Sequence, residues 1–226
     1  MDTSNINTNT NTNTNTKNNI VEIVNRNLKN AELKTNPFNH WIFNKVLPIK
    51  IAEDFLKLLI DVPEISFYSG KRETNNSTRV FLNKENCSKY SCMQDVVDIF
   101  NNPEIILQLS NICGKNLTKG KLRIEYTMDT GSFWLEPHLD IKEKMITFLI
   151  YLSNDPNSSE WGTTVYNNDL TFHSKAPYKQ NLGLMFMADK NTWHGVPEQN
   201  IQGIRRNLII NYVTSDWKSV HELAPV

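Results

Sequence analysis

Residues 145–152 read MITFLIYL, and this short apolar run decides how the second half of the chain is interpreted. Clusters of Gly, Pro, Asn, Asp and Ser, such as SNDPNSSEWG, flank it and its neighbours, which is typical of strands joined by turns. The pattern therefore predicts a series of short strands after Gly120. The other predicted strands are 121–127 (KLRIEYT), 163–166 (TTVY), 182–188 (LGLMFMA) and 207–214 (NLIINYVT).

Helical spacing of apolar residues dominates before Gly120. It runs from Pro48 to Asp61 and again over 93–113, where Pro103 is expected at the first position of a helix. Helices followed by strands predict an α+β domain with a double-stranded β-helix (jelly roll) core and an N-terminal helical support layer. We place the helices at about 48–113, the jelly roll at about 120–215 and the whole domain at 38–220.

The N-terminal residues have a different composition. Residues 4–19 are nearly all Asn and Thr (SNINTNTNTNTNTKNN) and offer no apolar face to bury, so residues 1–19 are predicted to be a disordered tail. Residues 20–34 carry a weak apolar periodicity that favours a short helix.

Bulk properties exclude several functional classes. The chain has 226 residues with 24 basic and 24 acidic side chains, so charge gives no case for a nucleic-acid or anionic-membrane partner. No apolar run approaches the roughly 18 residues that span a bilayer, and no signal peptide is visible. Cys87, Cys92 and Cys113 are too few and too irregular for a disulfide framework, which favours buried or idle thiols over a metal role. We expect a soluble, cytoplasmic protein.

His138-Leu139-Asp140, followed much later by His194, carries the chemistry. Side chains at i and i+2 of a strand share a face at about 7 Å, so the His138 imidazole and the Asp140 carboxylate can converge on one ion. His194 follows the strand at 182–188 and a turn, where it can supply a third ligand. Two His and one carboxylate on one face of a metal are the ligands of non-haem Fe(II) oxygenases. Each residue alone is more often structural; the three together favour a metal site.

Arg205 opens the last predicted strand, where Arg205, Asn207 and Ile209 share one face. A guanidinium inside an apolar barrel is costly unless it meets an anion with matching fork geometry. Either Arg205 or Arg206 faces inward, and we favour Arg205 because its face also carries the polar Asn207.

The runs WLEPHLD, ITFLIYLSND, WHGV and GIRRNLIINYV together resemble the Fe(II)/2-oxoglutarate-dependent dioxygenases, in particular their prolyl 4-hydroxylase-like branch. The resemblance covers about residues 120–215, and the preceding helices match that family's support layer. It is specific to the superfamily and does not name a substrate.

The resemblance implies that His138, Asp140 and His194 bind iron and that Arg205 binds the distal carboxylate of 2-oxoglutarate. It also implies that Tyr151 assists Arg205 and, on weaker grounds, that Tyr126 lies near the co-substrate. The alternative for both tyrosines is a core aromatic with a satisfied hydroxyl. The implied cofactors are Fe(II), 2-oxoglutarate and O₂, with ascorbate as a further reductant; succinate and CO₂ are the co-products.

The chain departs from the family at Trp161-Gly162-Thr163-Thr164, where many members have Gly-Gly-x-Leu. Asp140 favours hydroxylation, because halogenating relatives lack this carboxylate. The expected substrate is a prolyl or other protein side chain, an amino acid or a small metabolite. In the polar loop 68–79, Arg72 and Arg79 could meet an anionic substrate, although solvated loop residues are the more common interpretation.

Two rival functions remain open. A cupin-like metal-binding or sensing module would use the same three ligands but has no need of Arg205. A catalytically silent relative that serves as an interaction domain is the least favoured, since the ligand set is intact.

Overall fold

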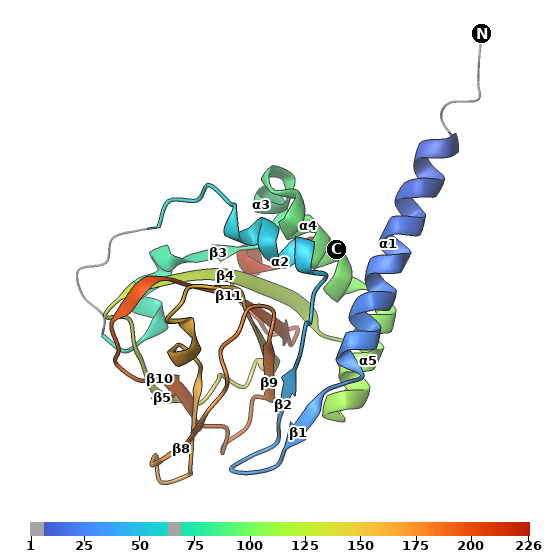
Figure 1. Cartoon of the computed structure of the whole chain (residues 1–226). Coiled ribbons are helices and arrows are strands. Elements are labelled where there is room, and N and C mark those ends of the chain that lie inside the picture. Colours follow the sequence, from blue (N-terminus) through green and yellow to red (C-terminus); the bar gives the residue numbers. More distant parts are fainter. Residues whose placement is uncertain (1–6, 63–68) are drawn as a thin grey trace.

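Residues 7–62 and 69–226 are described by the computed structural model, which folds them into two antiparallel β-sheets and a layer of helices (Figure 1). The strands are β1 (Glu32–Lys34), β2 (His40–Phe43), β3 (Arg79–Phe81), β4 (Lys121–Gly131), β5 (Leu135–His138), β6 (Lys144–Tyr151), β7 (Thr164–Tyr166), β8 (Phe172–Lys175), β9 (Gly183–Met187), β10 (His194–Val196) and β11 (Ile201–Val213). The larger sheet has the order β1-β2-β9-β6-β11-β4-β3, and the smaller has β5-β10-β7-β8.

The helices pack on the outer face of the larger sheet (Figure 1). Pro103 stands at the first position of its helix, and the Asn102 side chain caps that helix by accepting a hydrogen bond of 2.9 Å from the Glu104 N–H. The helices are α1 (Asn7–Leu28), α2 (Ile49–Leu56), α3 (Lys84–Lys89), α4 (Ser91–Asn101) and α5 (Pro103–Cys113), with short 3₁₀ helices η1 (Arg72–Thr78), η2 (Ser158–Glu160) and η3 (Val220–Glu222).

Strand alternation separates two cores. On β11, Leu208 and Ile210 join the core between the larger sheet and the helices, whereas Ile209 joins the core between the two sheets. Arg205 and Asn211 lie on the Ile209 face and are also buried. The inner face of the larger sheet is therefore unusually polar, and this polar face lines the pocket described below. The predicted α+β jelly roll with a helical support layer is confirmed.

All five predicted strands are present, but three-residue and four-residue strands were missed. β5, β8 and β10 form most of the smaller sheet, and β3 lies inside the segment predicted to be helical. Strands this short carry too few residues for alternation to register, and the pairing that stabilises them comes from distant segments.

The N-terminal prediction needs correction. Residues 7–19, predicted to be disordered, form the first turns of α1, while residues 1–6 lie outside the described part. Figure 1 shows this end of α1 projecting from the body. The packed end carries Val24 and Leu28, which are fully buried. Once those turns are fixed, each further helical residue adds a hydrogen bond without a new nucleation cost. The folded part thus begins before residue 38, because α1 and β1 already belong to it.

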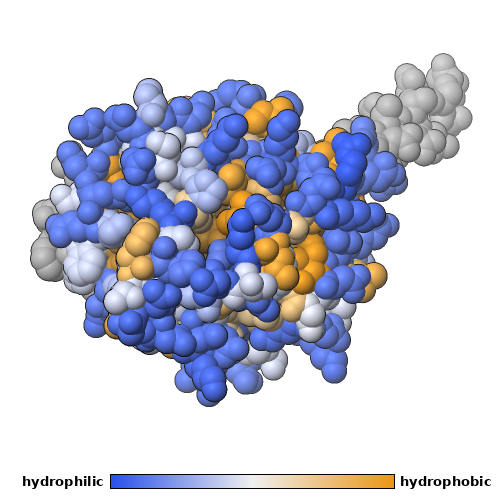
Figure 2. All heavy atoms as spheres, turned by 60° about the horizontal axis from the view of Figure 1, so that its bottom comes forward, coloured by the Kyte–Doolittle hydropathy of each residue, from blue (hydrophilic) through white to orange (hydrophobic). Residues whose placement is uncertain are grey.

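All three cysteines are buried and unpaired. Burial raises the pKa of Cys87 and of Cys92 to about 11, so both stay protonated and unreactive near neutral pH. None of the helices described has the length and apolar character needed to span a bilayer. The face in Figure 2 is mostly hydrophilic, with apolar side chains reaching the surface in limited areas.

Candidate active site

His138, Asp140 and His194 converge on one point. One nitrogen or oxygen ligand atom from each lies within 4.8 Å of the others, close enough for all three to bind a single metal ion. His138 ends β5 and His194 begins β10, and the two residues stand directly opposite each other in that antiparallel pair. Their ring centroids are 4.3 Å apart. Strand pairing in the smaller sheet therefore builds the site.

Backbone carbonyl groups orient both imidazoles. Nδ1 of His138 lies 2.7 Å from the Glu136 carbonyl oxygen, and Nδ1 of His194 lies 2.9 Å from that of Thr192. A carbonyl only accepts, so each Nδ1 carries the proton and each Nε2 keeps its lone pair for a ligand. Burial, together with the neighbouring His138, lowers the pKa of His194 to about 4, so this imidazole is neutral at neutral pH.

The Asp140 carboxylate is held on both oxygens. Lys144 Nζ donates to Oδ1 at 2.5 Å, and the Thr147 hydroxyl donates to Oδ2 at 2.5 Å. Burial alone would raise the pKa of Asp140, but the charge of Lys144 and these hydrogen bonds bring it well below its usual range. The carboxylate is thus ionised and fixed in place, as a metal ligand must be.

Gly195 allows β10 to approach β5 this closely. A Cβ atom at this position would lie 2.8 Å from the Leu135 carbonyl oxygen and 3.0 Å from that of Glu136. A larger residue after His194 would push the two strands apart and separate the histidines.

Arg205 is buried in the same cavity as the triad. Its Nε donates to the Trp161 carbonyl oxygen at 2.7 Å, and its Nη1 donates to Oδ2 of Asp129 at 2.8 Å. Its Nη2 is buried and has no hydrogen-bond partner within the described residues. Arg206 lies on the opposite face of β11, where its charge acts on Tyr126.

A second buried polar group without a partner among the described residues lines the same cavity as this arginine. This group is the Thr163 hydroxyl. An unmade hydrogen bond on a buried group costs about 1–3 kcal/mol, so two such groups in one cavity fit a ligand with acceptor oxygens. Thr163 was not predicted as a site residue from the sequence, in which the segment 161–164 showed only a departure from the family pattern.

Gly162 keeps that segment against β8. A Cβ atom here would lie 1.9 Å from the Ala176 carbonyl oxygen, so only glycine fits. Its neighbours, Trp161 and Thr163, present the carbonyl and the hydroxyl next to Arg205.

Tyr151 is fully buried between the two sheets, behind the cavity wall. Its hydroxyl oxygen accepts a 3.3 Å hydrogen bond from the Thr163 N–H. The ring stacks on Tyr178 at 4.4 Å, and the Tyr178 ring in turn lies 5.8 Å from the Arg205 guanidinium. Sequence reasoning missed Tyr178, because nothing in its local pattern marks it. Tyr151 therefore supports the Thr163 backbone and lies close to Arg205.

Assigning Tyr126 to the co-substrate was wrong. Its hydroxyl donates to the Phe55 carbonyl oxygen of α2 at 3.2 Å, inside the core beneath the helices. The inward positions of β4 are odd-numbered, so Tyr126 points away from the cavity. Glu125 and Asp129 occupy inward positions instead.

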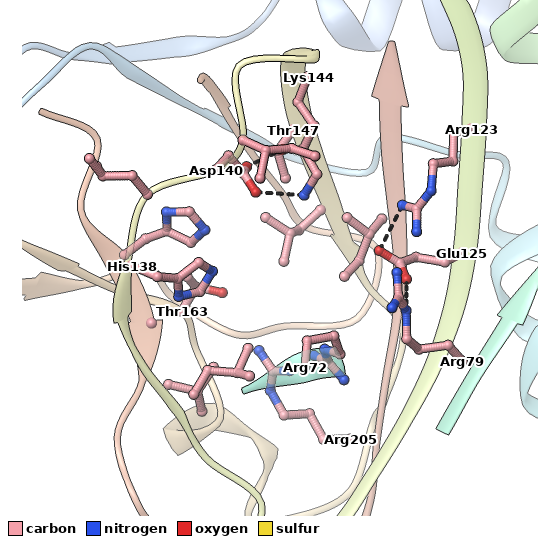
Figure 3. Close-up of a pocket in the computed structure, with 18 of the residues that line it drawn as sticks. Arg72, Arg79, Arg123, Glu125, His138, Asp140, Lys144, Thr147, Thr163 and Arg205 are labelled. Atoms are coloured by element: carbon pink, nitrogen blue, oxygen red, sulfur yellow. Dashed lines mark hydrogen bonds and ion pairs between the residues drawn. The ribbon is translucent and has the colours of Figure 1, made fainter. Parts of the chain in front are cut away.

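Arg72 and Arg79 line the pocket and are only partly exposed. Arg72 Nη1 donates to Oδ1 of Asp129 at 2.5 Å, and Arg79 Nε donates to Oε2 of Glu125. The favoured interpretation of these arginines as solvated loop residues was wrong, because η1 and β3 fold against β4. Figure 3 shows His138 and Asp140 on one side of the cavity, with Arg79, Glu125 and Arg123 across from them.

Comparison with known proteins rests on structure alone. No protein-family model and no curated protein matches the chain. Among solved structures, a Pseudomonas putida prolyl-4-hydroxylase superposes with a TM-score of 0.52 at 11% identity, covering 86% of this chain and 94% of that one. The present chain therefore has the fold of the solved prolyl hydroxylases.

Two further structures agree with this. A Trichoplax adhaerens prolyl hydroxylase, solved with a hypoxia inducible factor peptide fragment, has a TM-score of 0.54 at 13% identity, covering 89% of this chain and 92% of that one. A non-heme α-ketoglutarate dependent epimerase from nogalamycin biosynthesis has a TM-score of 0.52 at 13% identity, covering 86% and 83%. At such identities the likeness extends to the fold, and function has to be argued from the site.

Proposed function

We propose that this protein is an Fe(II)- and 2-oxoglutarate-dependent dioxygenase that hydroxylates an unactivated C–H bond of a prolyl, amino-acid-type or small-metabolite substrate. The observation that carries the proposal is the buried Arg205, whose Nη2 lacks a partner among the described residues, in one cavity with the His138-Asp140-His194 triad.

The donor set of the triad fits Fe(II). Two imidazoles and one carboxylate would leave the other coordination positions open for a co-substrate and O₂. Iron and 2-oxoglutarate, when bound, supply the oxidising power for attack on a C–H bond, with succinate and CO₂ as co-products.

The Arg205 end of the cavity fits the distal carboxylate of 2-oxoglutarate. Nη2 of Arg205 and the Thr163 hydroxyl are donors that need acceptors, and a carboxylate supplies them. Asp129 already engages Nη1, so it fixes the direction of the guanidinium. Leu149, Val196 and Ile209 line the space between and limit its water content.

Hydroxylation is favoured among the reactions that this fold supports. Asp140 occupies the ligand position that a halogenating site would leave for chloride, and Lys144 and Thr147 hold it there. Epimerisation by a protein of this fold shows that the fold does not decide the outcome.

Succinate formation tests the proposal. The purified protein, given Fe(II), ascorbate and 2-oxoglutarate, is screened against amino acids, prolyl peptides and small metabolites. Succinate release stimulated by a substrate that gains one oxygen atom is the expected result. Stoichiometric iron binding with no succinate from any mixture would instead favour the cupin-like sensing module.

A further inference from the structure

The inner face of the larger sheet carries two arginine–carboxylate–arginine clusters. Asp129 of β4 lies between Arg72 and Arg205. Four residues earlier on the same strand, Glu125 lies between Arg79 and Arg123. The strand rise separates the two carboxylate positions by about 13 Å, so they serve different parts of the cavity. The proposed function uses the first cluster only.

The Arg79–Glu125–Arg123 cluster lies at the triad end of the sheet. In the sheet, Arg123 of β4 stands opposite Asn211 of β11, and Asn211 stands opposite Thr147 of β6. Thr147 is the residue whose hydroxyl holds Asp140. Hydrogen bonds also join these three side chains, because Asn211 donates to the Thr147 hydroxyl at 2.9 Å and accepts from Arg123 Nη1 at 3.1 Å. A ligand at this cluster would therefore be close to the metal ligand Asp140.

The cluster retains hydrogen-bond donors and has little acceptor capacity left. Arg123 uses Nε for Glu222 at 2.6 Å and Nη1 for Glu125 and Asn211. Arg79 uses Nε for Glu125 and Nη1 for Asn76. These bonds leave the Nη2 groups of both guanidiniums, while both oxygens of Glu125 already accept.

Trp217 adds a third donor at the same place. Its ring lies 4.9 Å from the Arg123 guanidinium and lines the cavity. Its indole N–H is buried and lacks a partner among the residues described. The Phe81 ring also lies 4.9 Å from the Arg123 guanidinium, so two aromatic rings pack against this group. Such packing keeps the donors of this subsite in fixed directions.

A subsite rich in donors favours a group that can only accept hydrogen bonds. A carboxylate is such a group, and its geometry matches the guanidinium edge. Glu125 and Glu222 already offset the charges of Arg79 and Arg123, so the hydrogen-bond donors rather than a net positive charge select the ligand.

We propose that Arg79, Arg123 and Trp217 form a substrate subsite that binds a carboxylate of the primary substrate and holds its reacting carbon toward the triad. The inference rests on the proposed function, since it assigns the Arg205 cluster to 2-oxoglutarate. It narrows the substrate class to small carboxylic acids, including amino acids with a free carboxyl group.

Propionate and its isosteric amide, propionamide, test the subsite directly. The probe signal is the indole N–H resonance of Trp217, assigned by its loss in Trp217→Phe. The full chain is loaded with Zn(II) as a diamagnetic substitute for iron and saturated with 2-oxoglutarate. Propionate should shift this resonance saturably, and propionamide should not.

Arg79→Gln should raise the dissociation constant of propionate about tenfold or more, because a charge-assisted hydrogen bond is lost. This variant leaves Glu125 with one arginine, so Arg79→Gln/Glu125→Gln is the second variant, in which both charges are removed. Arg26→Gln, on the exposed side of α1, is the matched control and should bind like wild type.

No saturable shift with propionate, an equal shift with propionamide, or unchanged affinity in both Arg79 variants would overturn the subsite. Failure of the proposed function looks different. In that case 2-oxoglutarate would leave the Thr163 amide resonance unshifted, while the Trp217 response to propionate would persist.

Discussion

His138 and His194 face each other across β5 and β10, and both donate Nδ1–H to backbone carbonyl groups of their own strands or turns. This relationship presents two Nε2 lone pairs to one point before any metal binds. Preorganisation of this kind predicts that the ligand side chains affect metal binding far more than they affect folding.

Thr147→Val should weaken metal binding about 10–100-fold, because it removes the hydroxyl that fixes Oδ2 of Asp140 while keeping the side-chain shape. Competition with a chromogenic chelator measures the affinity. Thr171→Val, in an exposed loop, is the control. Equal affinity in wild type and Thr147→Val would show that Lys144 alone positions the carboxylate.

Arg205→Gln should raise the dissociation constant of 2-oxoglutarate at least about tenfold while metal binding is retained, because a charge-assisted hydrogen bond to the co-substrate is lost. Calorimetry with the metal-loaded protein gives both values. The neighbouring Arg206→Gln is the matched control, since its side chain lies on the opposite face of β11. A larger effect at Arg206 would contradict the assignment.

Gly162→Ala should destabilise the fold by about 1–3 kcal/mol, because the new methyl group would overlap the Ala176 carbonyl oxygen. Urea unfolding measures this change. The substitution also displaces the Trp161 carbonyl that accepts from Arg205, so 2-oxoglutarate affinity should fall with it. A variant as stable as wild type would mean that the strand connection tolerates the added atom.

Glu125→Gln should give a pH-dependent loss of stability. Burial alone would raise the pKa of Glu125, but Arg123 and Arg79 lower it to about 2, below its ordinary 4.5. The ionised carboxylate therefore stabilises the fold above pH 4.5, by about 1–3 kcal/mol, and this contribution is lost as the pH falls toward 2.

Urea unfolding of wild type and Glu125→Gln across that range measures the gap between them. The gap should be full at pH 7 and shrink as the pH falls below 4.5. Glu53→Gln, on the exposed side of α2, should show no such gap. A gap that is constant with pH would contradict the role of the ion pairs.

Local patterns predicted the long elements and the triad. MITFLIYL became β6, and the spacing of His138, Asp140 and His194 was enough to suggest one metal site, which the strand pairing then assembled. Such features are readable because periodicity and ligand spacing are properties of neighbouring residues.

Features that depend on distant pairing were not predictable. Arg72 and Arg79 resemble loop residues until η1 and β3 pack on β4, where they meet Asp129 and Glu125. Tyr126 was misassigned because the inward face of β4 follows from its register with β11, which no local pattern fixes.

Anaerobic titration of Fe(II) into the protein with 2-oxoglutarate tests the central claim most directly. The proposed chemistry predicts a visible charge-transfer absorption band that needs both Fe(II) and 2-oxoglutarate and is absent in His138→Ala. No band in the wild-type protein, or an equal band in His138→Ala, would contradict the assignment of the triad and with it the proposed function.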